Sequence, residues 1–265
     1  MARVVFITGA NTGIGLEAVR ALYRSKESYQ ILLGSRSLTN ANSAIDTVKS
    51  EFPSSNSTIT PVQIDIENDN SIKTAYSTIE SQLGKLDVLI NNAGAQFEQQ
   101  FSAGKLSERE LWNKSWDVNV TGTQIVTTTF IPLLLKSSDP RLLFITSGTA
   151  TLSGSSNLAT AVNRSPTAKG WPKPGFGGVP AYRSAKTGLN MLMREWHRIL
   201  KEDRVKTWAI SPGYLATGLG GNPEMSRKAG AGDPAVAGPF IRSVVEGERD
   251  ADIGLVLTRG GIQDW

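Results

Sequence analysis

The stretch Arg3-Val-Val-Phe-Ile-Thr-Gly-Ala-Asn-Thr-Gly-Ile-Gly15 decides the fold of this chain. Its first five residues are typical of a buried strand, and an amphipathic helical pattern begins at Gly15. Glycines at such a junction let the backbone turn tightly and approach a pyrophosphate, while the helix N-terminus adds free N–H donors. A glycine triplet alone is also compatible with a structural turn. Its place between a first strand and a first helix favours a phosphate-binding loop.

The alternation of short apolar runs with longer helical patterns continues through the chain. Strands are predicted over residues 3–7, 29–34, 60–64, 86–90, 141–146, 206–210 and 254–257, and helices over 15–25, 40–52, 70–83, 111–136 and 182–201. Apolar strands that alternate with helices form a parallel sheet covered on both faces. We therefore expect an α/β fold, a doubly wound parallel sheet of the Rossmann type, in a single catalytic domain spanning 1–265. Its ligand crevice would lie at the carboxyl ends of the strands.

Two segments depart from this rhythm. Residues 153–180 are rich in Gly, Pro, Ser and Asn, and a loop of this length is typical of a lid, a binding loop or a disordered insert. Its aromatic residues Trp171 and Phe176 could cover a substrate or could merely pack the loop onto the domain. The second segment, 214–235, carries five glycines between Gly218 and Gly232 and is expected to be a mobile substrate loop.

Composition and charge narrow the function classes. The chain has 265 residues, a net charge of +4, no cysteine and one histidine. The basic residues are scattered, so no nucleic-acid partner is expected, and no apolar run reaches the roughly 20 residues of a membrane span. Without cysteine, and with His197 inside a helical pattern, we expect no metal site. The expected location is cytoplasmic.

The end of the second strand bears on the choice of a nucleotide ligand. A site specific for NAD places a carboxylate there to bind the ribose hydroxyls, whereas this chain has Gly34-Ser35-Arg36. Arg36 can make a charge-assisted fork to a 2′-phosphate, and Ser35 can donate a hydrogen bond to it. The alternative is an ordinary surface arginine. The sequence favours NADP(H), and we interpret Asp65 and Glu67 as acids of a surface loop.

Three residues in the second half of the chain suggest proton transfer. Tyr182 and Lys186 are four positions apart and so share one face of a predicted helix, and Ser147 follows the fifth predicted strand. A lysine ammonium beside a phenol is expected to lower the phenol pKa. Such a hydroxyl can protonate a carbonyl oxygen as hydride arrives at carbon, and Ser147 can hydrogen-bond the same oxygen. A Tyr-x-x-x-Lys pair alone occurs by chance on many helices, so it indicates a function only together with other motifs of the chain.

The glycine segment after the first strand, Asn91-Asn92-Ala93-Gly94 after the fourth, Ser147 and the Tyr182–Lys186 pair occur here together. With these motifs the sequence resembles the short-chain dehydrogenase/reductase family over nearly its whole length. Together with the two residues after the second strand, the resemblance implies cofactor-binding roles for Gly9, Asn11, Thr12, Gly13, Ile14, Gly15, Ser35, Arg36, Asp65, Ile66, Asn91, Ala93, Gly94, Tyr182, Lys186, Pro212, Gly213, Leu215 and Thr217. It implies catalytic roles for Asn119, Ser147, Tyr182 and Lys186, with Asn119 anchoring a proton-relay water. The implied activity is NADPH-dependent reduction of a ketone or aldehyde, a small-molecule carbonyl substrate, with Tyr182 as general acid.

Two departures from the family pattern refine this expectation. The gap between Ser147 and Tyr182 is unusually long and resembles that of monomeric NADPH-dependent carbonyl reductases, so a monomer or dimer is expected rather than a tetramer. The tail from Gly260 to Trp265 resembles that of fungal ketoreductases. The alternatives are reduction of a C=C or C=N bond, or a dedicated biosynthetic step, at the same site. A non-catalytic NADP(H)-binding sensor is the alternative from another class.

Overall fold

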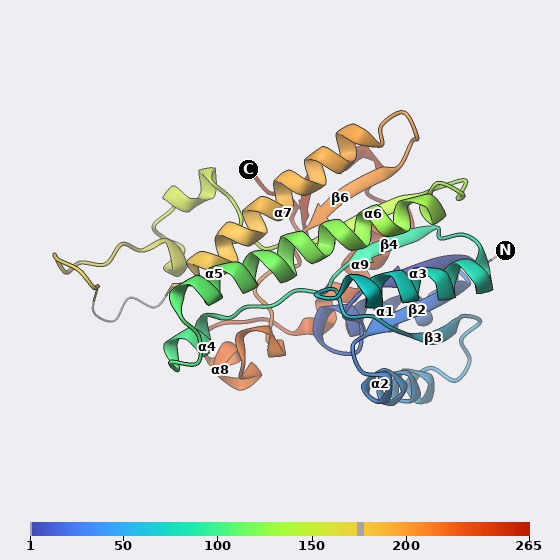
Figure 1. Ribbon diagram of the computed structural model, residues 1–265, viewed down its shortest axis with the longest axis horizontal. Coiled ribbons are helices and arrows are strands. Elements are labelled where there is room, and N and C mark those ends of the chain that lie inside the picture. The colour runs from blue at the N-terminus through green and yellow to red at the C-terminus, as the bar shows by residue number, and fades with distance from the viewer. Residues whose placement is uncertain (1, 174–177) are drawn as a thin grey trace.

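One twisted sheet organises the protein, as the computed structural model shows for residues 2–173 and 178–265 (Figure 1). In these residues the strand order is β3-β2-β1-β4-β5-β6-β7-β8, parallel throughout except for the antiparallel pairing of β8 with β7. The strands are β1 (Arg3–Ile7), β2 (Tyr29–Ser35), β3 (Thr58–Gln63), β4 (Val88–Asn91), β5 (Arg141–Ile145), β6 (Lys206–Ile210), β7 (Val256–Thr258) and β8 (Gly261–Ile262). The expected doubly wound α/β class is confirmed, and the predicted strands are all present with ends displaced by two residues or fewer.

Helices cover both faces of the sheet. On one face α1 (Gly13–Tyr23), α2 (Leu38–Glu51) and α9 (Ala237–Val245) bury one apolar cluster with the strands. On the other face, nearer the viewer in Figure 1, α3 (Asp69–Leu83), α6 (Thr123–Leu134) and α7 (Pro180–Ile199) bury a second. Strands enclosed in this way must be apolar on both sides, which explains the continuous apolar runs in the sequence. No helix in the described ranges is both long and apolar enough to cross a bilayer.

The long helix predicted over residues 111–136 is three consecutive segments. It begins as α5 (Glu108–Trp116), widens into a π-helical segment at Asp117–Gly122 and continues as α6. At Gly122 the helix approaches the end of β3 so closely that a Cβ atom would lie 2.4 Å from the carbonyl oxygen of Ile66. Such π-helical interruptions often occur at functional sites, and this one contains Asn119.

Three helices of the described residues were not predicted from the sequence. They are α4 (Glu98–Ser102), α8 (Pro223–Lys228) and α9. The pattern for α9 was present, because Phe240, Ile241, Val244 and Val245 recur at helical spacing and are all buried. This helix packs on α1 through Gly238, where a Cβ atom would lie 2.3 Å from the carbonyl oxygen of Glu17. The two shorter helices are too brief to give a periodic signal.

The described part of the 153–180 insert projects from the body of the domain near the start of α7 (yellow, Figure 1). It contains two short 3-10 turns, Ser153–Ser156 and Ala161–Asn163. The Trp171 side chain is 86% exposed, so in this structure it neither covers a cavity nor packs the loop onto the domain. Phe176, the other aromatic residue considered for such a role, lies outside the described residues.

Candidate active site

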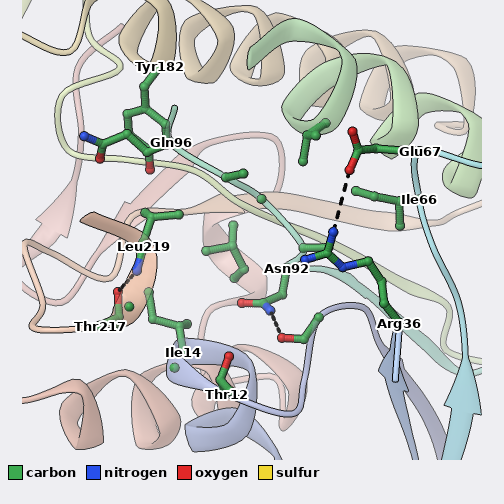
Figure 2. A pocket seen from close by; sticks show the side chains of 18 of the residues that line it. Thr12, Ile14, Arg36, Ile66, Glu67, Asn92, Gln96, Tyr182, Thr217 and Leu219 are labelled. Atoms are coloured by element: carbon green, nitrogen blue, oxygen red, sulfur yellow. Dashed lines mark hydrogen bonds and ion pairs between the residues drawn. The ribbon is translucent and has the colours of Figure 1, made fainter. Parts of the chain in front are cut away.

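A cavity of about 580 Å³ opens at the carboxyl ends of the strands, where the fold class predicts a ligand crevice (Figure 2). Segments from both halves of the chain form its wall. The expected site residues that line it are Gly9, Asn11, Thr12, Gly13, Ile14, Arg36, Asp65, Ile66, Ala93, Gly94, Tyr182, Lys186 and Thr217. The fold thus brings the glycine turn, the arginine after β2 and the tyrosine–lysine pair of α7 into one cavity.

The glycine turn presents backbone rather than side chains to the cavity. Gly9 and Gly13 have φ values of +62° and +56°, a region that other residues rarely adopt. A Cβ atom on Gly9 would lie 2.9 Å from the Cα atom of Ala93, because the segment after β4 packs directly on the turn. The hydroxyl of Thr8 fixes that contact by accepting 3.0 Å hydrogen bonds from the backbone N–H groups of Asn92 and Ala93. The wall is therefore narrow and firmly held.

The N-terminus of α1 contributes donors to the same wall. Its N-cap, Thr12, makes no side-chain capping bond within the described residues, and no acid occupies the first turn. The first N–H groups of an α-helix lack partners within the helix, and the helix dipole makes this end attractive to anions. Gly13 and Ile14, the first two helical residues, line the cavity. This arrangement can bind a phosphate.

Arg36 lies at the other side of the turn, next to an acid that we had interpreted as part of a surface loop. Its guanidinium is 3.8 Å from the Glu67 carboxylate, and both residues line the cavity (Figure 2). The Arg36 side chain is 75% exposed, so this pair contributes little stability and can be released. The hydroxyl of Ser35, in contrast, is buried and bonds to the backbone of Ser37 within the turn.

Tyr182 and Lys186 lie on the buried face of α7 and reach the cavity together. Burial raises the pKa of Tyr182 to about 12, the Ser147 hydroxyl acts in the opposite direction, and the Glu98 charge raises it further. Burial also lowers the pKa of Lys186 to about 8. The Lys186 Nζ atom is 5.9 Å from the centroid of the phenol ring and donates a 2.9 Å hydrogen bond to the carbonyl oxygen of Ile145. We expected a lowered phenol pKa, and this is wrong for this structure, because burial raises the pKa and Lys186 is not among the groups that shift it.

Asn119 lies behind the cavity wall and is fully buried. Its amide donates 2.8 and 2.9 Å hydrogen bonds to the carbonyl oxygens of Ala95 and Ser115, and its Oδ1 atom accepts one from the N–H of Ala95. A Cβ atom on Gly94 would lie 2.8 Å from this Oδ1 atom and 3.1 Å from the Lys186 Nζ atom. Gly94 therefore lies between Asn119 and Lys186 and has no side chain that would separate them.

Ser147 follows β5 at the start of the segment that leads into the insert. Its hydroxyl oxygen lies 3.0 Å from that of Thr149 and accepts a hydrogen bond from the Thr149 N–H. The same hydroxyl lowers the pKa of the Tyr182 phenol. The amide of Gln263 donates to the Ser147 carbonyl oxygen at 3.2 Å, so residues near the end of the chain support this serine. Ser147 itself is beside the cavity rather than on its wall.

The remaining expected residues do not line the cavity. At Gly15 a Cβ atom would lie 2.5 Å from the Asn92 side-chain nitrogen, so this glycine allows α1 to pack under the turn. The Asn91 amide donates a 3.0 Å hydrogen bond to Thr127 of α6. Three residues of the segment after β6 also lie off the wall, namely Pro212, Gly213 and Leu215.

Sequence reasoning missed several residues of the wall. They are Ile64, Glu67, Asn92, Ala95, Gln96, Phe97, Gln100, Val118, Ile145, Thr146, Gly218 and Leu219. Ile64, Asn92 and Thr146 directly follow a strand and Ile145 ends one, so the rule that ligands bind at the carboxyl ends of parallel strands could have indicated these four. Gln96 lies beside Tyr182 (Figure 2), Phe97 and Gln100 follow it closely in the sequence, and no motif marks these three wall residues.

The sequence and the fold resemble those of known proteins. Residues 3–159 match the short chain dehydrogenase family. The chain is 44% identical to the short-chain dehydrogenase/reductase tropE of Talaromyces stipitatus over 98% of its length and 96% of the relative, and 44% identical to eupG of a Phoma species over 99% and 97%. The crystal structure of NADPH-bound carbonyl reductase from chicken fatty liver superposes with a TM-score of 0.78 at 22% identity, covering 100% of this chain and 99% of that one. The protein belongs to the short-chain dehydrogenase family of oxidoreductases.

Proposed function

We propose that this protein is an NADPH-dependent reductase that converts a ketone or aldehyde to an alcohol, with Tyr182 as the proton donor. One observation carries the proposal. The anion-binding turn, the Arg36 guanidinium and the buried Tyr182–Lys186 pair line a single cavity that both a dinucleotide and a small carbonyl compound could share.

The donors of the wall fit a nicotinamide dinucleotide phosphate. The uncapped N-terminus of α1 and the glycine backbone suit the pyrophosphate, and Arg36 suits a 2′-phosphate because a guanidinium binds phosphate bidentately. Asp65 and Ile66 lie on the wall beyond the glycine turn, as the adenine end requires. Lys186 and Thr217 lie at the other end, where the nicotinamide ribose and carboxamide would be held. When bound, the reduced nicotinamide supplies a hydride to the carbonyl carbon.

Residues of the chain itself donate the proton to the substrate and restore it afterwards. With a pKa of about 12, Tyr182 keeps its proton at neutral pH and can donate it to the carbonyl oxygen as negative charge develops there. The Ser147 hydroxyl lowers the pKa of the same phenol, and it can hold the substrate oxygen next to the phenol by a hydrogen bond. Lys186, with a pKa of about 8, can lose and regain a proton near neutral pH. Together with Asn119 behind Gly94, it forms the route by which Tyr182 is reprotonated.

The substrate is held at the end of the cavity formed by Gln96, Phe97 and Gln100. The 153–180 insert and the 214–235 loop border this end, since Leu219 lies on the wall and Arg183, next to Tyr182, anchors the insert. We infer that these two segments select the substrate and that the insert acts as a lid. Trp171, exposed in this structure, is available to cover a bound molecule.

The Tyr182→Phe variant tests the mechanism. It removes the proton donor without changing the shape of the ring, so we expect NADPH to bind with unchanged affinity and turnover to fall by about 100-fold or more. NADPH fluorescence titration and the rate of NADPH oxidation across a panel of ketones and aldehydes measure the two effects. Turnover near that of the wild type would show that another group delivers the proton.

A further inference from the structure

The N-terminus of α7, the helix that carries Tyr182 and Lys186, lacks a cap of its own. Its N-cap residue, Val179, makes no side-chain hydrogen bond within the described residues, and the first helical residue, Pro180, has no N–H group. The N–H of Arg183 is already bonded to the carbonyl oxygen of Val179. Ala181 and Tyr182 are therefore the first-turn donors that need partners from outside the helix.

Glu98 supplies such a partner to Tyr182. Its Oε1 atom accepts a 2.9 Å hydrogen bond from the backbone N–H of Tyr182, although the two residues are 84 positions apart in the sequence. Glu98 is only 6% exposed. A carboxylate at a helix N-terminus is favoured by the helix dipole, and a charge-assisted hydrogen bond is stronger than a neutral one. This one contact attaches the backbone of the tyrosine to α4.

Its surroundings make Glu98 unlike an ordinary surface acid. Its Oε2 atom is buried and has no hydrogen-bond partner among the described residues, a costly state that a purely structural acid would avoid. The next residue, Gln99, donates its amide to the carbonyl oxygen of Gly220 in the 214–235 loop. The short helix α4 is thus held between α7 and the substrate loop, and Gln96, just before it, lies on the cavity wall with Tyr182 (Figure 2).

We propose that Glu98 is a positioning residue for Tyr182: it caps α7 from a separate helix, sets where the phenol lies and places a negative charge near it. The proposal rests on the proposed function of Tyr182 as proton donor. Glu98 does not line the cavity, so it acts through the tyrosine and not on the substrate.

Several charged groups near the phenol affect the pKa of Tyr182 together with Glu98 or could do so. Glu98 raises the pKa of Tyr182, in addition to the larger effect of burial, whereas the Ser147 hydroxyl lowers it. Lys186, on α7 itself, has its Nζ atom 5.9 Å from the centroid of the phenol ring. From α5, which packs on α7, the exposed Lys114 lies over the ring of Phe97. Arg183 points to the insert, where it bonds to Asn163.

Two substitutions separate the cap from the charge. Glu98→Gln keeps an oxygen that can accept the Tyr182 N–H but removes the negative charge, so the Tyr182 pKa should fall and the high-pH loss of reductase activity should move to lower pH. Glu98→Ala removes both, so the Tyr182 amide should also exchange with solvent at least tenfold faster, and kcat should fall about tenfold through misplacement of the phenol while NADPH affinity stays unchanged.

The measurements are amide hydrogen exchange at Tyr182 by NMR, the phenolate absorbance of each variant minus that of its Tyr182→Phe counterpart, and the pH profile of kcat/KM. Glu108→Gln, which removes an exposed charge from α5, is the matched control and should change none of them. The proposal is overturned if Glu98→Gln leaves the Tyr182 titration unchanged, or if Glu98→Ala leaves the Tyr182 amide as protected as before. Should Glu98→Ala fail to fold, the titration of Glu98→Gln decides alone. Amide exchange and absorbance require no turnover, so a failure of the proposed reaction is recognised separately by the carbonyl panel.

Discussion

The glycine turn after β1 and the insert before α7 border the same site but are built in opposite ways. At the turn, backbone packs on backbone, with Gly9 against Ala93 and the Thr8 hydroxyl holding two N–H groups of the neighbouring segment. The described part of the insert is attached by a few side chains. Arg183 bonds to the carbonyl oxygens of Thr149 and Val162 and to the side chain of Asn163.

This difference indicates a division of labour. Backbone contacts as tight as those of the turn tolerate little change, so that end of the cavity suits a ligand that never varies. Loops held by a few side chains can change their sequence without disturbing the scaffold, so the other end suits a varying substrate. The chain end also contributes to the second region, since the carbonyl oxygen of Trp265 accepts a hydrogen bond from the Ser153 N–H.

The largest effect is expected from adding a single methyl group to the turn. Gly9→Ala places a Cβ atom about 2.9 Å from the Ala93 Cα atom, so one segment must move and the phosphate-binding wall is distorted. Overpacking of this kind costs about 1–3 kcal/mol. Because the wall relieves this strain by moving out of its phosphate-binding geometry, we expect NADPH affinity to fall by up to about 100-fold. Isothermal titration calorimetry measures it.

Gly104→Ala is the matched control, because Gly104 has a similar φ of +69° but no atom of the described residues lies within 4 Å of its added Cβ. This variant should lose about 1 kcal/mol of stability from the backbone strain alone and keep its NADPH affinity. Equal losses of affinity in the two variants would mean that the close packing of the turn has no special part in binding.

An intermediate effect, on the affinity for NADPH, is expected from removing the side chain of Arg36. Arg36→Ala removes the proposed ligand of the 2′-phosphate, so NADPH affinity should fall about tenfold to thirtyfold while NADH affinity hardly changes. Glu67→Gln removes the competing partner of Arg36 and should maintain or raise NADPH affinity. Titration of each variant with both cofactors measures the difference. Equal losses for NADPH and NADH in Arg36→Ala would show that the arginine does not bind the phosphate.

The smallest effect is expected from loosening the insert. Arg183→Ala removes two hydrogen bonds from α7 to the insert, at Val162 and Asn163, and a third to Thr149 just before it, so the KM for the carbonyl substrate should rise about fivefold while NADPH affinity stays the same. Arg164→Ala, an exposed charge change within the insert, is the control and should alter neither. Steady-state kinetics with a large and a small ketone measure it, and a parallel loss of NADPH affinity would contradict the separation of the two regions.

The sequence by itself determined the fold class and the residues whose chemistry is tied to a local pattern. Apolar runs alternating with helical patterns predicted the sheet, and the glycine turn, Arg36, Tyr182 and Lys186 each follow a strand or share a helix face. Positions at the ends of parallel strands meet at one edge for geometric reasons, so their convergence could be predicted from the chain order alone.

Only the tertiary structure decided what depends on contacts between distant segments. Glu98 caps a helix that begins 82 positions later, Glu67 pairs with Arg36, and α9 packs closely on α1 at Gly238. The pKa of Tyr182 belongs to this group as well. A lysine four positions away predicts a lower pKa, whereas the burial that raises it to about 12 comes from the tertiary packing, which also brings Glu98 and Ser147 close enough to shift this pKa.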